Sequence, residues 1–219
     1  MGAEPGQSAL ADLIARADET ALAASGLGCL DRCLPLLGST DQVLRPLWVS
    51  LADGTAWEGA LAEVRQGLRA SRASHEGFAP ASHEGSAPAS REGSTPASRE
   101  GSAPDSSDRG AATALARRML DAVPAARSAG ALRSWADTCS ATALRIHRLL
   151  DAGDDAMAPL VAAELRRQIR VLELLEADGD AVTGNLRQVL DVSTEGRRVL
   201  RAVVSRSRRS GTRAGSDLP

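Results

Sequence analysis

Four tandem copies of one octapeptide divide this chain into parts with different physical properties. The copies read ASHEGFAP, ASHEGSAP, ASREGSTP and ASREGSAP, and together they fill residues 73–104. Each copy has almost no apolar surface to bury, whereas ordering one residue costs roughly 1–2 kcal/mol of conformational entropy. We therefore expect residues 71–110 to form a disordered linker, which acts as a tether or, alternatively, as a repeated ligand for a partner.

The two flanks of this linker are the parts of the chain that can fold. A segment of about 70 residues rarely gains more than ~3–5 kcal/mol from its own core. We therefore expect residues 1–70 and 111–204 to pack together as one bundle, with two separate domains as the alternative. Residues 205–219 carry little apolar surface, and we expect them to form a disordered, Arg-rich tail.

Both flanks show apolar residues at helical spacing, and no segment alternates with the period of a strand. Aromatic residues make up 2% of the chain, which favours close-packed helices over a sheet. The pattern predicts an all-α bundle of roughly six to eight helices. We expect a first helix to stop near Gly26, a second to end at Gly38, and the last to be interrupted by Gly196.

The clearest helix start is the pair Thr55 and Glu58, which has the spacing of a capping box. A stripe of apolar side chains follows at helical spacing, comprising Trp57, Leu61, Val64 and Leu68. We expect this stripe to be buried, and we expect all three tryptophans to anchor the core.

The composition removes several classes of enzyme. The chain has neither lysine nor tyrosine, so Schiff-base chemistry, a P-loop lysine and phenolic acids are excluded. His147 is the one histidine outside the repeats. Asp151 lies four residues later and could orient it, but no nucleophile is recognisable nearby. We expect a boundary or surface histidine, no catalytic residues and no cofactor.

Two patterns resemble metal sites and fail in detail. Cys29, Cys33, Cys139 and His147 could supply zinc ligands, but their spacing lacks the close pairs of structural zinc sites, so we expect buried core cysteines. The stretch from Glu176 to Arg187 begins like a calcium loop with acids at alternate positions. It places Ala181 where glycine is required and Arg187 where a bidentate glutamate belongs. We expect no bound metal.

Positive charge gathers near the C-terminal end, although the whole chain has a net charge of −2. This cluster could bind phosphate groups, or it could be a cationic helix end that frays into solvent. The candidate nucleic-acid-binding residues are Arg197, Arg198, Arg201, Arg206, Arg208, Arg209 and Arg213.

These observations favour a non-enzymatic helical interaction or scaffold protein that binds another protein or a copy of itself. The alternative is a nucleic-acid-associated accessory protein that uses the Arg-rich tail. The start MGAEPGQSAL has no signal-peptide pattern, no apolar run is long enough for a membrane, and three cysteines fit a reducing compartment. We therefore expect a cytoplasmic protein without a membrane partner. The identity of the partner, the process and the oligomeric state do not follow from the sequence.

Overall fold

The computed structural model describes residues 5–38, 42–76, 106–151, 158–176 and 182–214, and these ranges contain eight helices and no strand. The all-α prediction and the predicted number of helices are therefore confirmed. The helices are α1 (Pro5–Arg16), α2 (Glu19–Leu37), α3 (Arg45–Asp53), α4 (Trp57–Glu76), α5 (Ser106–Asp121), α6 (Ala129–Leu150), α7 (Pro159–Glu176) and α8 (Val182–Ala214).

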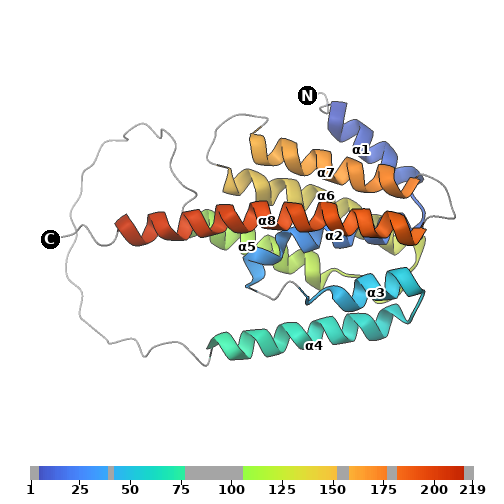
Figure 1. The fold of residues 1–219 in the computed structure, drawn as a ribbon, viewed down its shortest axis with the longest axis horizontal. Coiled ribbons are helices and arrows are strands. Elements are labelled where there is room, and N and C mark those ends of the chain that lie inside the picture. The colour runs from blue at the N-terminus through green and yellow to red at the C-terminus, as the bar shows by residue number, and fades with distance from the viewer. Residues whose placement is uncertain (1–4, 39–41, 77–105, 152–157, 177–181, 215–219) are drawn as a thin grey trace.

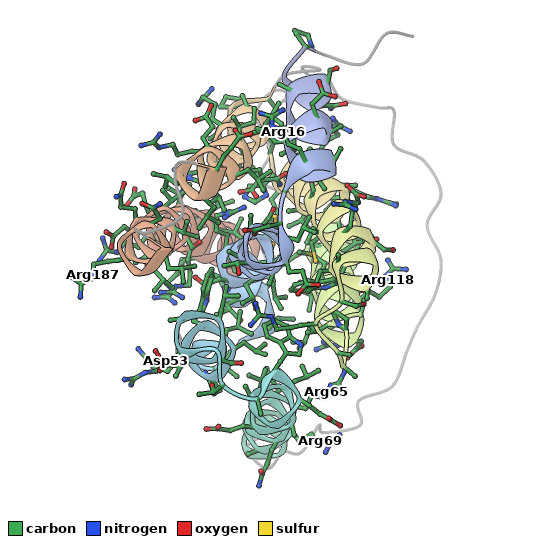
Figure 2. The ribbon with its side chains drawn as sticks, turned by 90° about the vertical axis from the view of Figure 1, so that its right-hand side faces the viewer. Arg16, Asp53, Arg65, Arg69, Arg118 and Arg187 are labelled. Atoms are coloured by element: carbon green, nitrogen blue, oxygen red, sulfur yellow. The ribbon has the colours of Figure 1, made fainter. Side chains whose placement is uncertain are left out.

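Helix α2 lies in the middle of the bundle and packs against α5, α6, α7 and α8. Every residue from Ala21 to Leu34 is buried. Figure 2 looks along the bundle and shows α2 enclosed by the other helices, while the labelled side chains of Arg118 and Arg187 point outward. The central helix therefore presents apolar or small residues on all of its sides.

The expectation that a helix would stop near Gly26 is wrong, because α2 continues through this residue. A Cβ atom at Gly26 would overlap the ring of Trp135 on α6. The glycine therefore serves the close approach of two helices instead of a helix end. The actual break comes earlier, where the amide of Ala21 donates to Asp18 Oδ1 at 2.7 Å and caps the start of α2. Gly38 ends the helix as predicted, with φ 64°.

The expected interruption at Gly196 is also wrong, since α8 passes through it without a break. A Cβ atom there would overlap the side chain of Arg32 on α2. This glycine makes room for a long buried side chain.

Helix α4 lies at the edge of the molecule and packs chiefly against α3 (Figure 1). Its predicted stripe of Trp57, Leu61, Val64 and Leu68 is buried, as expected. The indole of Trp57 also donates to the carbonyl of Pro124 at 2.8 Å, which ties the start of α4 to the loop after α5.

Three helices extend beyond their expected bounds. Helix α4 reaches Glu76 and α5 begins at Ser106, so both enter the segment predicted as linker, and residues 77–105 lie outside the described part of the chain. Helix α8 reaches Ala214, ten residues into the predicted disordered tail. Arginine and alanine favour helix, and lengthening an existing helix avoids the cost of nucleation. Residues 215–219 lie outside the described ranges.

None of the described helices combines the length and the hydropathy of a membrane-spanning segment.

Candidate functional site

The core of the bundle holds an ion pair between α2 and α7. Arg32 is 1% exposed and Glu164 is 0% exposed. Arg32 Nε donates to Glu164 Oε2 at 2.8 Å, and Nη2 donates to Oε1 at 2.6 Å. This two-pronged geometry is the strongest arrangement available to a guanidinium and a carboxylate. Because neither charge can be hydrated, each depends on the other.

His147 belongs to the same buried cluster, so the prediction of a boundary or surface histidine is wrong. Its side chain is 3% exposed, and Nε2 lies 3.7 Å from Glu164 Oε2. Nδ1 lies 2.8 Å from the carbonyl of Ala143. Asp151, the expected partner, instead accepts from the amide of Leu160 at 2.8 Å, at the start of α7. The carboxylate beside His147 thus comes from another helix, which the spacing within α6 could not reveal.

The cluster continues through Gln168 to Ser140 on α6. Gln168 Nε2 donates to Glu164 Oε1 at 2.9 Å, and Ser140 Oγ donates to Gln168 Oε1 at 2.6 Å. The sequence does hold a signal for this arrangement, since Glu164 and Gln168 share a helical face with the apolar Val161 and Leu172. The hydrogen-bonded chain joins α2, α7 and α6 across the core.

The electrostatics of the cluster keep Glu164 ionised. Burial alone would raise its pKa, but the charges of Arg32 and His147 and the hydrogen bonds from Arg32 and Gln168 hold the pKa of Glu164 below its ordinary value. Burial raises the pKa of the neighbouring Cys29 thiol to about 12.

The three cysteines are buried in the core, as expected. Burial raises the pKa of Cys33 and Cys139 well above the ordinary value, so these thiols stay protonated and are poor nucleophiles. Within the described residues, no three His, Cys, Asp or Glu side chains are arranged to hold a metal ion. Residues 177–181 of the calcium-like stretch lie outside the described part, and the rest belongs to the end of α7 and the start of α8. Its first residue, Glu176, forms an ion pair with Arg16 on α1.

The structure places the predicted phosphate-binding arginines on α8, in different surroundings. Arg197 is directed inward, and its Nη1 donates to Asp31 Oδ1 on α2 at 2.8 Å. Arg198 is exposed and lies 3.9 Å from Glu195. Arg201 and Arg206 are exposed. The α8 backbone also carries Arg208, Arg209 and Arg213, whose side chains are outside the described set.

A groove of about 510 Å³ runs along the surface between α1 and α6. No local pattern in the sequence indicates this groove, because it depends on how two helices from opposite flanks pack. Ser140 lies in this groove and connects it to the buried cluster through Gln168. The groove is lined from α1 by Gln7, Leu10, Ala11 and Ile14, and from α6 by Asp137, Ser140, Ala141, Leu144, Arg145, Arg148 and Leu149.

The charged residues of this groove are separated along its length, with an acid near one end and two arginines near the other. Asp137 lies toward the N-terminal end of α6, and Arg145 and Arg148 lie two to three helical turns later. All three side chains are exposed, and none of them forms an ion pair within the described residues. Apolar side chains lie between the two charged ends.

A second groove of the same volume lies between α7 and α8, and five of its seven lining residues are charged, against three of eleven in the α1–α6 groove. Its charged residues are of both signs and face each other across the groove, while Ala163 and Val192 are its apolar contribution. The charged side chains are Arg166, Arg167, Arg170, Asp191 and Glu195. The α1–α6 groove is therefore the better candidate for an apolar partner.

Comparisons of this chain with protein-family models, with curated proteins and with solved structures found no match.

Proposed function

We propose that this protein is a non-enzymatic interaction or scaffold protein, and that its α1–α6 groove binds a helical segment of a protein. The observation that carries this proposal is the groove itself, which combines an apolar lining with charged residues at its ends. An amphipathic helix places apolar side chains at positions i, i+3, i+4 and i+7 into such a groove.

The dimensions of the groove fit this kind of ligand. Its α6 lining extends from Asp137 to Leu149, which corresponds to about 18 Å at the rise of an α-helix. A partner helix of about three turns would cover this length. The charged groups at the two ends would set its direction, because acidic residues are favoured near Arg145 and Arg148 and basic residues near Asp137.

The polar side chains in the core support a structural role over a catalytic one. His147 and Glu164 are enclosed on all sides, so a substrate would have to enter the core to reach them. Ser140 does reach the groove, but it donates its hydroxyl proton to an amide oxygen, which is not a general base. Ser140 therefore lacks the activating partner that a nucleophile needs.

Site-specific photo-cross-linking in the native cells tests the proposal. A photoreactive residue at Ala141, which is exposed in the groove, should form adducts with a protein. The matched control is the same residue at Ala62, which is exposed on α4 outside the groove. Adducts that form at position 141 and not at position 62 are expected, and their absence at 141 would overturn the proposal. Mass spectrometry identifies whether the adduct is another copy or a different protein.

The arginines of helix α8 support nucleic-acid binding as a second candidate function. It continues to Ala214 and extends beyond the neighbouring helices (Figure 1), and its arginines lie on a regular helix instead of a coil. Cationic helices bind DNA phosphates with an affinity that falls as salt increases. Retention on DNA that weakens with salt and is lost on truncation after Val204 would support this function. Equal retention of the truncated protein would exclude it.

A further inference from the structure

We propose that the occupant of the α1–α6 groove is α6 of a second copy of this chain, so that the protein forms a two-fold symmetric homodimer. This inference rests on the proposed function, since it names the helix that the groove binds. It begins from the charges on α6, where the order of charged and small residues is complementary to itself.

Three exposed residues at equal spacing carry the argument. Asp137, Ala141 and Arg145 are four residues apart, so they lie on one face of α6. If two α6 helices meet antiparallel with the two-fold axis at Ala141, Asp137 of each copy faces Arg145 of the other. The antiparallel contact then forms two symmetry-related ion pairs, each between Asp137 of one copy and Arg145 of the other. An interface around a two-fold axis must match itself in this way.

The side chains around the axis allow the helices to approach. Ala141 is small and exposed, so the two backbones can come close at the crossing point. Leu144 and Leu149 are partly buried in the free chain and would be covered further. Packed helix axes are separated by about 8–10 Å, and small residues at the contact favour the lower end of this range.

The groove also gives the second helix a place to lie. In the dimer, α6 of each copy would occupy the space between α1 and α6 of the other, with Ala11 of α1 on the outer side. Because α1 and α6 of one copy are in contact, each partner α6 would lie over the groove, and the α1–α6 pairs of the two copies would form two facing layers around the axis. An unrelated partner would require no symmetry about Ala141, and this symmetry is what favours a second copy.

Charge-swap variants test the symmetry directly, with sedimentation equilibrium of the full chain as the measurement. The variants are Asp137→Arg and Arg145→Asp, which put like charges opposite each other in a homodimer. Each change is at an exposed position, so circular dichroism should show unchanged helix. We expect each single variant to weaken the dimer at least about tenfold, because both ion pairs become repulsive.

Two further samples distinguish the proposal from a simple loss of charge. The double variant Asp137→Arg/Arg145→Asp restores opposite charges across the axis and should recover dimerisation. An equimolar mixture of the two single variants should form a heterodimer, since position 137 of each then faces an opposite charge at position 145 of the other. Recovery in both samples is the expected result.

Three outcomes would overturn the inference. The wild-type chain could stay monomeric at all concentrations tested, the single variants could dimerise like wild type, or neither the double variant nor the mixture could recover. The proposed function fails separately: a cross-link from Ala141 to a different protein would leave the groove as a binding site while excluding the second copy. Absence of any adduct at Ala141 would remove both.

Discussion

Helices α2 and α4 have almost the same length, 19 and 20 residues, but they occupy opposite environments. Helix α2 is covered chiefly by α5, α6, α7 and α8, whereas α4 packs chiefly against α3 at the edge of the molecule (Figure 1). The sequence of α4 accordingly shows one apolar stripe with charged residues elsewhere. The sequence of α2 has apolar or small residues on all sides, as a helix buried all round requires.

The arginines of the two helices show the same difference. Arg69 on α4 is exposed at the surface of the molecule (Figure 2), and the half-buried Arg65 donates to the backbone carbonyl of Val123 at 3.5 Å and not to an acidic side chain. Arg32 on α2 is enclosed and is matched by Glu164 from a distant part of the chain. A charge in the centre of the bundle therefore fixes which helices must lie next to it, and a charge on the edge does not.

Removal of Arg32 should give the largest effect. We expect Arg32→Ala to lower the free energy of unfolding by about 3–5 kcal/mol, because it leaves the carboxylate of Glu164 buried without its cation. The control Arg69→Ala on α4 should change it by no more than about 0.5 kcal/mol. Chemical denaturation followed by circular dichroism measures both. If Arg32→Ala lowered the free energy of unfolding no more than the control, the claim that Glu164 depends on Arg32 in the core would be contradicted.

Acid should act on the same pair, with an effect smaller than removal of the arginine. The pKa of Glu164 is lower in the folded state than in the unfolded chain, so its contribution to stability is present above its unfolded pKa of about 4.3. That contribution is lost as the pH falls through the folded pKa. We expect the double variant Arg32→Met/Glu164→Met to lose less stability than wild type between neutral pH and pH 3, a window chosen to include that unfolded value. Parallel stability profiles of the two proteins would show that the pair does not contribute.

Glycine-to-alanine changes should alter the free energy of unfolding in opposite directions in the two helices. Gly26→Ala in α2 places a methyl group against the ring of Trp135, and we expect a loss of about 1–3 kcal/mol. At Gly67 in α4, a Cβ would meet Val43 Cγ2 at 3.8 Å, an ordinary contact. Gly67→Ala should therefore stabilise the protein by about 0.5–1 kcal/mol. Thermal denaturation of both variants tests the comparison, and a stabilising Gly26→Ala would refute the close approach.

A loss of stability smaller than that of Arg32→Ala is expected where α4 is attached to the loop after α5. Trp57→Phe keeps most of the buried ring but removes the hydrogen bond to the carbonyl of Pro124, and we expect a loss of about 1 kcal/mol. Denaturation by urea measures this difference. No loss at all would mean that the ring alone holds this end of α4.

The predictability of the fold from the sequence differs between the same two helices. The stripe of α4 could be identified, because burial on one side leaves a period in the sequence. The sequence pattern wrongly predicts a helix end near Gly26 within α2, because a helix surrounded on all sides has a weak apolar period and its glycines resemble helix ends. The distinction depends on Trp135, more than a hundred positions away, which no local pattern contains.

The candidate site is harder still to predict from the sequence, because its contacts also join residues that are far apart in the chain. His147 was paired with Asp151 by local spacing, although its carboxylate neighbour is Glu164 on the next helix. The α1–α6 groove forms from residues on both sides of the repeats, so it exists only after the flanks pack. The burial of the cysteines and tryptophans was predictable, since their residue types and stripe positions both indicate a core.

The 132 positions between Arg32 and Glu164 also have a consequence for synthesis of the chain. At about 5–20 residues per second, Glu164 follows Arg32 after roughly 7–26 s, and the residues of α8 follow later still. During this interval α3, α5 and α6 are made, but α7 and α8, which cover other sides of α2 in the finished protein, are still missing. The nascent chain therefore leaves part of its most apolar helix uncovered until α7 and α8 emerge, which makes α2 the segment that a ribosome-associated chaperone would need to protect.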